Sequence, residues 1–397
     1  MTERLYYEDV YMTEFDAAVL GCTKEGEQWR IIPDRSAFYP EGGGQSGDRG
    51  SLTVLSSGEE IEVSDTREDG DDVVLICSAP VADGEKIRGK LNWEYRFDRM
   101  QNHSGEHIIS GLIHNRFGYS NVGFHMSSDR MTIDLDGEIP DDALAEIEQA
   151  ANEIVWKNVP IRTDLLSEEE AEQIDYRSKK KLQGEIRIVS IPGADVCACC
   201  GTHVSHTGEI GIIRIISHVR FKGGVRMEMM CGRWAYRYMT QLFGQNHQVS
   251  VLLSSKMHET ARAVRKLLDD QSMLKGQLIG MRYDQIERKA EELRGCGNVL
   301  IFVRDYTPVL LQKLTARIME QTSSAVFSFS GSDEVGYKYA VGQAGGNLKE
   351  TVQAVNSELS GRGGGKPFFQ QGSVQADRKR IELFFNERYK DILIVDM

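Results

Sequence analysis

Residues 98–112 read "DRMQNHSGEHIISGL", and this stretch places His103 and His107 four residues apart within an apolar run. The surrounding pattern predicts a helix over Asn92 to Phe117. Residues four apart lie one above the other on a helix, so the two imidazole rings can face one ion. The pair alone is weak evidence, because half-exposed helix faces often carry histidines. A metal site therefore needs partners from elsewhere in the chain.

The same stretch also matches H-x-x-E-H, the inverted zinc-protease motif, with Glu106 as its acid. A protease would use Glu106 as the base and a downstream glutamate as third ligand, for which the acidic run "SEEEAEQ" (167–173) offers candidates. This interpretation leaves the Cys/His cluster at 197–206 unexplained, and we do not favour it.

Gly105 lies between the two histidines. A glycine costs about 1 kcal/mol in a helix interior, which points to a close approach of another segment to the helix at this position.

The downstream cluster is "CACCGTHVSHTGEIG", from Cys197 to Gly211. Thiolate and imidazole together suit zinc best among common cellular ions. Cys199 and His203 form one plausible chelating pair, with Gly201 letting the chain fold around the metal, but spacing alone does not decide among the three cysteines or the two histidines. A redox or merely buried cysteine cluster is the alternative reading. Together with the helical pair, the cluster predicts a tetrahedral site of three nitrogens and one sulfur.

Composition is typical of a globular protein with several domains. A chain of 397 residues exceeds one ordinary core, so two to four domains are expected. Seven cysteines, three of them within four positions, do not suit a disulfide framework and favour a reducing compartment. The chain has no apolar run of about 18 residues and no signal-peptide pattern, so we expect a cytoplasmic protein without a membrane span. The net charge of −13 argues against general nucleic-acid binding but allows local basic patches.

The pattern of apolar runs predicts an α+β multidomain protein with four segments. Residues 1–90 alternate short apolar runs with Gly and Asp turns, as in a small antiparallel β domain. Residues 91–234 mix strands with helices around the histidine pair and the cysteine cluster. Residues 235–295 are strongly helical with a break at two serines, which predicts a long antiparallel helical hairpin. Residues 296–397 indicate a compact α/β domain.

Apolar spacings of three and four residues place the individual helices. Apart from the histidine-bearing helix, they are expected at 141–157, 233–253, 256–293, 310–321 and 348–359. The apolar positions of the second hairpin helix, interrupted by Gln271, are Val264, Leu267, Leu274, Leu278 and Met281.

A first glycine-rich stretch, "RSAFYPEGGGQSGDRG" (35–50), contains the polar triplet Ser36, Gln45 and Asp48. Its glycines at 42–44 let the backbone approach a ligand closely and point amide groups at it. A plain β-turn is the alternative, since short glycine runs usually form turns. The stretch is therefore a candidate ligand loop.

A second glycine-rich stretch, "SGRGGGKPFFQQGS" (360–373), is not a phosphate-binding P-loop, because Pro367 stands where Ser or Thr should follow Lys366. Arg362 and Lys366, in an expected flexible, amide-rich loop beside Phe368 and Phe369, suit a phosphate backbone and a stacked base. The two aromatic rings fit a core equally well. Other basic candidates are Lys179, Lys180, Lys181, Arg220 and Lys222. Charge runs are usually solvated faces, but in an acidic chain such islands are where a polyanion would bind.

These segments resemble a known family. The H-x-x-x-H at 103–107, the upstream "WEYRFDRMQNHS" and the downstream C-x-G-T-H-V-x-x-T-G-E-I-G are similar to the editing domain of alanyl-tRNA synthetase and its free-standing AlaX relatives. The resemblance implies that Cys199 and His203 join His103 and His107 as ligands of one Zn²⁺ per chain, with Cys197 and Cys200 as spectators. It also implies a small β-barrel-like N-terminal domain and a zinc editing domain.

The resemblance extends to both glycine-rich stretches. AlaX-type proteins carry T-x-F-Y-P-x-G-G-G-Q-P-G-D where this chain has Ser36 and Ser46 in place of Thr and Pro, a change that bears on fine substrate discrimination. The motif implies that Ser36 and Gln45 read the substrate hydroxyl and orient the ester. The residues expected to bind substrate beside them are Gly42, Gly43, Gly44, Asp48 and Thr202. The second stretch resembles the G-G-G-x-P segment of the DHH-associated C-terminal domain, which is linked to tRNA binding and subunit pairing.

The resemblance implies a trans-editing deacylase that hydrolyses serine, with glycine as a second substrate, from mischarged alanine tRNA. No adenylate-forming domain precedes residue 1, so we expect a free-standing long-form AlaX and not a synthetase. A homodimer through the hairpin or the C-terminal domain is expected. Two alternatives remain: a non-catalytic tRNA-binding protein with structural zinc, and a zinc hydrolase of small molecules or peptides.

Overall fold

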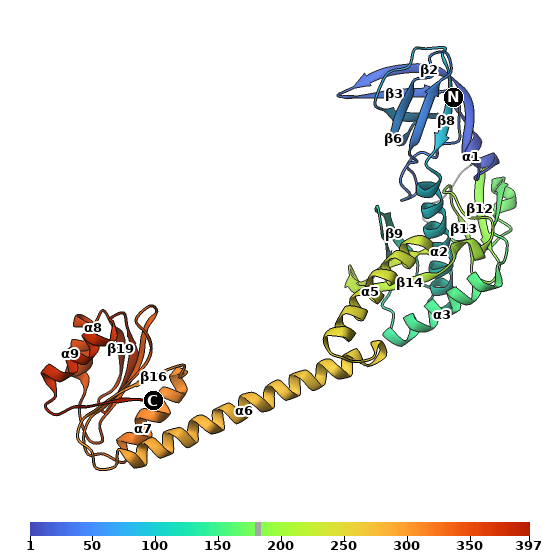
Figure 1. Ribbon diagram of the computed structural model, residues 1–397. Helices are drawn as coiled ribbons and strands as arrows, with labels where there is room; N and C mark the ends of the chain where they lie inside the picture. Colours follow the sequence, from blue (N-terminus) through green and yellow to red (C-terminus); the bar gives the residue numbers. More distant parts are fainter. Residues whose placement is uncertain (179–183) are drawn as a thin grey trace. The chain divides into compact units, whose positions relative to one another are not determined.

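The computed structural model describes residues 1–178 and 184–397, so Lys179, Lys180 and Lys181 lie outside the described residues. The chain forms two compact units, Met1–Gln248 and Val249–Met397, which are described separately (Figure 1). The boundary falls inside the segment expected to be a helical hairpin. The four-segment division therefore stays a prediction.

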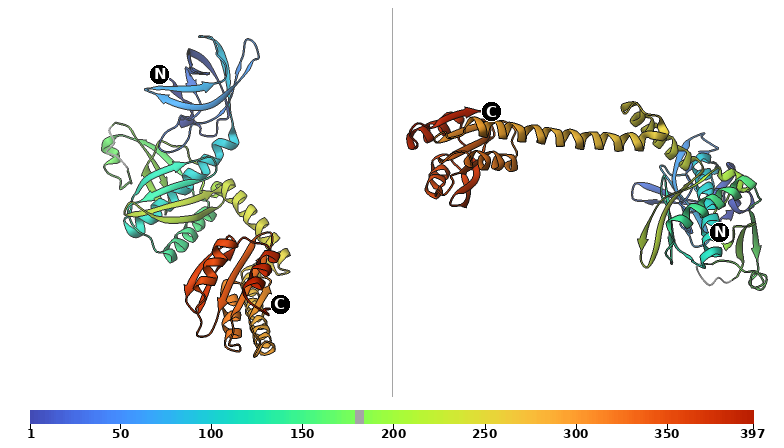
Figure 2. Two further views of the ribbon diagram at one scale, coloured as in Figure 1. Left: turned by 90° about the vertical axis from the view of Figure 1, so that its left-hand side faces the viewer. Right: turned by 90° about the horizontal axis from the view of Figure 1, so that it is seen from below.

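A closed six-stranded barrel opens the N-terminal unit, which confirms the expected small antiparallel β domain (Figures 1 and 2). Buried and exposed residues alternate along its strands: in β8, "KIRGKL", every second residue is buried, so one face of the strand fills the barrel. In barrel order the strands are β2 (Glu14–Glu25), β3 (Gln28–Pro33), β7 (Asp72–Cys77), β6 (Glu60–Asp69), β5 (Gly50–Val54) and β8 (Lys86–Leu91). A short parallel pair, β1 (Glu3–Arg4) with β4 (Arg35–Ser36), and the helix α1 (Leu5–Glu8) flank it.

The helix α2 (Trp93–Phe117) confirms the helix predicted from the opening stretch. Asn92 caps it by accepting a hydrogen bond from the Tyr95 amide (3.1 Å), and Gly118 ends it with a φ of 73°. Every residue from Asp98 to Gly111 is buried, because α2 packs on α3, β13 and β15 at once. The histidine pair therefore lies on a central helix and not on a half-exposed one.

Two sheets and a second helix surround α2. The four-stranded sheet has the order β14 (Ile213–Phe221), β15 (Gly224–Cys231), β10 (Met131–Leu135) and β9 (Asn121–Met126). The three-stranded sheet consists of β11 (Arg162–Leu166), β12 (Ile186–Ile191) and β13 (Asp195–Ala198). The predicted helix at 141–157 is α3 (Asp141–Lys157), which shares one apolar core with α2 and the larger sheet. Short turns of helix complete this part: α4 (Glu168–Ala171) and η1 (Thr207–Ile210).

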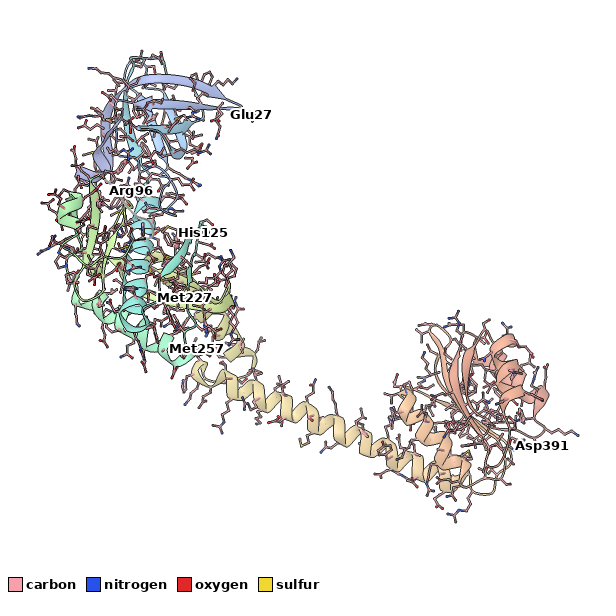
Figure 3. The ribbon with its side chains drawn as sticks, turned by 180° about the vertical axis from the view of Figure 1, so that it is seen from behind. Glu27, Arg96, His125, Met227, Met257 and Asp391 are labelled. Carbon is pink, nitrogen blue, oxygen red and sulfur yellow. The ribbon has the colours of Figure 1, made fainter. Side chains whose placement is uncertain are left out.

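One buried ion pair ties the barrel to α2. Arg96, fully buried in the first turns of α2, donates from Nε to Asp48 Oδ2 (2.8 Å) and also bonds this carboxylate through Nη2. Its remaining donors reach the carbonyl groups of Val10 (2.9 Å) and Ala37 (2.6 Å). Figure 3 labels Arg96 at the end of α2 nearest the barrel. These contacts fix the position of the histidine-bearing helix relative to the barrel.

Two helices follow where the hairpin was expected: α5 (Gly232–Leu252) and α6 (Thr260–Glu292), separated by the single turn η2 (Met257–Glu259). Only Ile286 and Ala290 are buried on α6. The apolar positions predicted to form the hairpin seam are exposed, from 39% at Val264 to 63% at Met281. The helices are confirmed, and their pairing as a hairpin stays a prediction.

The C-terminal unit is built on one six-stranded sheet. Its order is β19 (Arg362–Lys366), β20 (Phe369–Val374), β18 (Gly336–Gly342), β17 (Val326–Ser332), β16 (Val299–Val303) and β21 (Leu393–Asp396). Only the pairs β16–β17 and β16–β21 are parallel. Helices α8 (Lys349–Glu358) and α9 (Arg378–Arg388) pack in one apolar core of the sheet, and α7 (Pro308–Met319) with the end of α6 packs in the other.

The second glycine-rich stretch differs from the flexible loop that we expected. Residues Arg362–Lys366 form the edge strand β19, which pairs antiparallel with β20. Phe369 packs against the core beside α7, whereas Phe368 is 42% exposed. Helix α9 was not predicted at all, because its sequence "RKRIELFFNER" is dominated by charge. Among the described residues, no helix has both the length and the apolar character needed to cross a membrane.

Candidate metal centre

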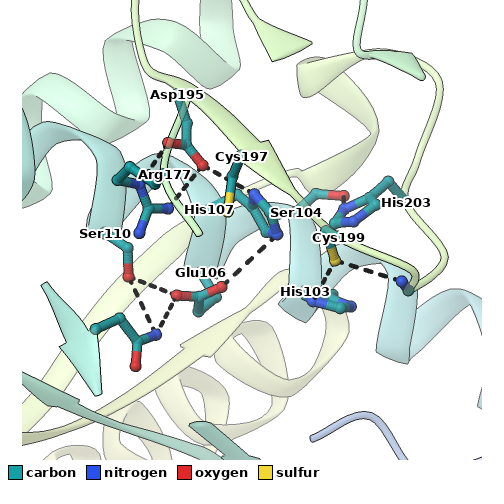
Figure 4. Close-up of polar contacts among 12 residues, drawn as sticks. His103, Ser104, Glu106, His107, Ser110, Arg177, Asp195, Cys197, Cys199 and His203 are labelled. Atoms are coloured by element: carbon teal, nitrogen blue, oxygen red, sulfur yellow. Dashed lines mark hydrogen bonds and ion pairs between the residues drawn. The ribbon is translucent and has the colours of Figure 1, made fainter. Parts of the chain in front are cut away.

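Four side chains from two separate segments converge beside α2. His103 and His107 come from adjacent turns of this helix, and Cys199 and His203 come from the segment after β13 (Figure 4). Each offers one ligand atom, and all four atoms lie within 4.8 Å of one another; His103 Nε2 and Cys199 Sγ are 3.5 Å apart. The three imidazoles are buried and the thiol is partly buried. These are the four residues that the sequence resemblance selected.

The outer nitrogen of each imidazole is occupied by another side chain. Nδ1 of His103 contacts Gln45 Oε1 (2.9 Å). Nδ1 of His107 contacts Asp195 Oδ2 (2.9 Å), and Nδ1 of His203 contacts Ser104 Oγ (3.2 Å). A hydrogen on each Nδ1 leaves the Nε2 lone pair free, which is the usual arrangement of metal-bound histidine. All three rings are thus oriented with Nε2 toward the thiolate.

The geometry of this group fits a metal ion. Ligand atoms around tetrahedral zinc lie roughly 3.3–3.7 Å apart, and His103 Nε2 and Cys199 Sγ are 3.5 Å apart. His203 Nε2 is buried and has no hydrogen-bond partner within the described part of the chain, as expected for an atom that binds an ion. Burial lowers the pKa of His203 to about 3, so its ring is neutral. Burial alone would raise the pKa of Cys199, but the imidazoles of His103 and His107 hold it well below its usual range, which favours the thiolate.

Two glycines permit the close packing. A Cβ on Gly201 would lie 2.1 Å from Cε1 of His103, so only glycine lets the Cys199–His203 turn pass over the ring. A Cβ on Gly105 would lie 2.2 Å from Sγ of Cys231 on β15. The close approach inferred from Gly105 is therefore confirmed.

Sequence reasoning missed the support of His107. Arg177 grips Asp195 with two parallel hydrogen bonds, Nε to Oδ1 and Nη2 to Oδ2, both 2.7 Å, and Asp195 in turn contacts His107 (Figure 4). Burial would raise the pKa of Asp195, but these two partners lower it to about 2. No local pattern marks Arg177, since it lies 18 residues before its partner.

Glu106 lies close to the histidine pair. Its carboxylate is buried, with Oε1 accepting hydrogen bonds from Ser110 Oγ and Asn121 Nδ2 and with Oε2 lying 4.0 Å from His107 Nε2. It is not one of the four grouped ligands. The carboxylate therefore lies beside the candidate ion site, and the third protein partner of the histidines is Cys199, not an acidic residue of 167–173 as a protease would need.

The chain is similar to proteins with names that concern alanyl-tRNA. A family model described as "Threonyl and Alanyl tRNA synthetase second additional domain" matches residues 186–228, and one described as "tRNA synthetases class II (A)" matches residues 2–95. The "Alanyl-tRNA editing protein AlaX-L" of Pyrococcus horikoshii is 29% identical over 96% of both chains. The "Alanyl-tRNA editing protein Aarsd1" of Danio rerio is 26% identical over 94% of both.

The chain is a relative of the alanyl-tRNA editing proteins. An alanine–tRNA ligase of Ignicoccus hospitalis is 29% identical as well, but the chain covers 96% of its own length and 42% of the ligase. The similarity to the editing proteins is thus end to end, whereas the similarity to the ligase is confined to part of that enzyme.

The glycine loop of this editing-protein relative reaches the candidate metal centre through Gln45. Besides contacting His103, Gln45 donates from Nε2 to Thr202 Oγ1 (2.8 Å) and accepts from the Thr202 amide (3.2 Å). Both residues are buried. The structure thus brings Gln45 and Thr202 together, and Gln45 in turn contacts His103.

The other loop residues hold the loop itself. Ser36 is fully buried, and its Oγ accepts a hydrogen bond from the Phe38 amide (3.0 Å). Asp48 accepts hydrogen bonds from Arg96 and from the Tyr39 amide (2.6 Å). Gly42 and Gln45 close a tight turn on each other, with Gly43 and Gly44 at φ angles of 61° and 90°. Direct substrate contact by these residues stays a prediction.

The described basic candidates lie on strand edges and hairpin ends. Arg220 and Lys222 belong to the β14–β15 hairpin, where the Arg220 side chain is 85% exposed and contacts Glu138 (3.1 Å). Arg362 and Lys366 are exposed at the two ends of the edge strand β19, and Lys366 Nζ lies 5.9 Å from the Phe368 ring. Binding of RNA by these residues stays a prediction.

Proposed function

We propose that this protein is an aminoacyl-tRNA deacylase that hydrolyses the ester of mischarged alanine tRNA, with seryl-tRNA(Ala) as the main substrate and glycyl-tRNA(Ala) as the second. The observation that carries the proposal is the convergence of His103, His107, Cys199 and His203 in a chain related end to end to alanyl-tRNA editing proteins.

We assign one zinc ion to the four side chains, since thiolate with three imidazoles is a donor set typical of zinc. When bound, the ion would supply a positive charge that positions or polarises the ester and its attacking water. The protein's part is to hold the ligands: Gln45 orients His103, Asp195 orients His107 and Ser104 orients His203. The aminoacyl ester is already activated, so positioning supplies much of the catalysis.

Substrate reading is assigned to the glycine loop. Ser36 and Gln45 would read the hydroxyl of serine and orient the ester, with Gly42, Gly43, Gly44, Asp48 and Thr202 shaping their surroundings. A site built to bind a hydroxyl rejects alanine because its buried polar groups would be left unpaired. Ser36, Gln45 and Thr202 are buried, and Gln45 contacts His103, which supports a role for this loop at the site.

Binding of the tRNA body is assigned to basic residues on both units, Arg220 and Lys222 on one and Arg362 and Lys366 on the other, together with Lys179, Lys180 and Lys181. We regard the C-terminal unit as a DHH-associated domain. Homodimerisation would use α6 or this unit, and the exposed apolar positions of α6 support that assignment. Each phosphate contact adds a salt-dependent contribution to affinity.

Two other functions have less support. A non-catalytic tRNA-binding protein would need only structural zinc, but Glu106 and the glycine loop place polar groups beside the ligands. A zinc hydrolase of small molecules or peptides would not need the basic residues of β19.

The test is release of labelled serine from seryl-tRNA(Ala), with alanyl-tRNA(Ala) and seryl-tRNA(Ser) in parallel. The Cys199→Ala/His203→Ala double variant removes two ligands, and Cys200→Ala is the matched control because Cys200 lies outside the ligand group. Loss of serine from the first substrate alone, abolished in the double variant only, is expected. No release by zinc-loaded, folded wild type would move the assignment to a binding role.

A further inference from the structure

We infer that Arg177 is a positioning residue of the metal centre: it fixes Asp195 as the hydrogen-bond partner of His107 and so holds the orientation of this ring. The inference rests on the metal site proposed above. It adds a residue that none of the sequence motifs contains.

The contact geometry supports a positioning role. Both guanidinium hydrogen bonds to Asp195 are 2.7 Å long, which is the two-pronged arrangement that fixes a carboxylate plane most firmly. The Arg177 backbone is fixed as well, since its amide donates to Val196 O (2.9 Å) and its carbonyl accepts from the Ala198 amide (2.9 Å). Arg177 is therefore attached to β13 on both sides of Cys197.

Asp195 contacts the nitrogen of His107 that faces away from the other three ligands. His107, Asp195 and Cys197 form a second group of three ligand atoms within 4.8 Å of one another, and Asp195 is not a member of the group of four. A buried carboxylate without a partner would turn toward another cation or donor, because a buried charge needs a partner. Arg177 occupies both oxygens of Asp195, which leaves one lone pair of Oδ2 for His107 Nδ1.

A matched pair elsewhere in the same unit provides the control. Arg226 on β15 grips Asp134 on β10 with two hydrogen bonds of 2.6 and 2.7 Å, the same geometry. Neither residue belongs to the ligand groups. If breaking any Arg–Asp pair weakened Zn²⁺ binding, the Arg177 and Arg226 variants would both bind Zn²⁺ more weakly. If Arg177 positions a metal ligand, only the Arg177 variants would do so.

The experiment measures Zn²⁺ affinity by competition with a chromophoric chelator and records the absorption spectrum of the Co²⁺-substituted protein. Full-length wild type, Arg177→Met, Arg177→Lys and Arg226→Met are compared, with circular dichroism as the folding check. We expect Arg177→Met to weaken Zn²⁺ binding about 10- to 100-fold and to change the Co²⁺ spectrum. Arg177→Lys should recover part of both, and Arg226→Met should match wild type.

Zn²⁺ affinity and a Co²⁺ spectrum of Arg177→Met equal to those of wild type would overturn the inference while leaving the proposed function intact. If Arg177→Met does not fold, Arg177→Lys decides: an unchanged spectrum and affinity overturn the inference, and an intermediate loss supports it. Failure of wild type itself to bind Zn²⁺ would instead remove the proposed metal site, and the inference with it.

Discussion

Gln45 in the glycine loop accepts a hydrogen bond of 2.9 Å from the Nδ1 of His103, 58 residues further along the chain. This contact joins the loop expected to read the substrate to the helix expected to hold the metal. The conformation of the loop and the orientation of His103 are thus coupled, and substitutions in the loop should change the affinity for Zn²⁺.

Gln45→Ala should weaken Zn²⁺ binding about 10-fold or more, because His103 loses the acceptor that orients its ring. Zn²⁺ affinity by chelator competition checks this. Gln28→Ala is the control, since the Gln28 side chain donates to Ser64 Oγ on the barrel and belongs to neither ligand group. Equal affinity in both variants would show that the Gln45 contact does not orient the ligand.

Gly201→Ala should displace the His103 ring, because the new Cβ would lie 2.1 Å from Cε1 and 2.4 Å from Nδ1. We expect a loss of about 1–3 kcal/mol in the free energy of unfolding, together with reduced zinc content. Urea unfolding and metal analysis measure the two effects. Gly21→Ala on the barrel, where a Cβ meets nothing within 4 Å, should change neither.

The Asp134–Arg226 pair should make stability depend on acid pH. The Arg226 guanidinium lowers the pKa of Asp134, so the ionised carboxylate is favoured in the folded state. Its contribution is fully present above the unfolded pKa, about 3.9, and is lost as pH falls through the lower folded value. Asp134→Asn should therefore melt below wild type at pH 7, by about 2 °C, and the difference should disappear near pH 2. A difference that persists at pH 2 would contradict the ionic explanation.

Arg362→Ala/Lys366→Ala should weaken tRNA binding and reduce the slope of log K against log salt by roughly one per lost phosphate contact. Filter binding at several salt concentrations measures both. Lys379→Ala/Lys390→Ala removes the same charge from exposed positions of the same unit and is the control. An identical slope in the two double variants would remove β19 from the RNA interface.

Leu274→Glu/Leu278→Glu on α6 should convert a dimer to a monomer, because these side chains are 61% and 57% exposed and would bury apolar surface on pairing. Light scattering after size-exclusion chromatography reports the mass. The control is Gln277→Glu, which adds a carboxylate to the same helix without changing an apolar position. A wild-type monomer would refute the dimer outright.

Local chemistry explains what the sequence could predict. The helix α2 was predictable from its spacing and its Asn92 cap, whereas the family resemblance of two motifs, and not their spacing, selected the four grouped side chains. The barrel followed from alternating short strands. Each of these is specified by residues near one another in the chain.

The supports of the ligands could not be predicted in the same way. Ser104 lies 99 residues before His203, and Asp195 lies 88 residues after His107, so these partners are chosen by the fold and leave no local pattern. Helix α9 was missed although it has a usable signal: Asp377 caps it, and Ile381, Phe384 and Phe385 follow helical spacing. Glycines at 363–365 suggested a loop, but strand pairing with β20 outweighs their low strand propensity.

The Arg96–Asp48 tie has a consequence for anyone who wishes to transplant this centre into another scaffold. A fragment beginning at residue 91 would contain every metal ligand, yet Arg96 would be left as a buried guanidinium without its counter-ion, and His103 would be free to rotate. A fragment that is meant to keep the geometry of the four side chains must therefore include the barrel segment, which supplies Asp48 and Gln45 although it contains none of the four.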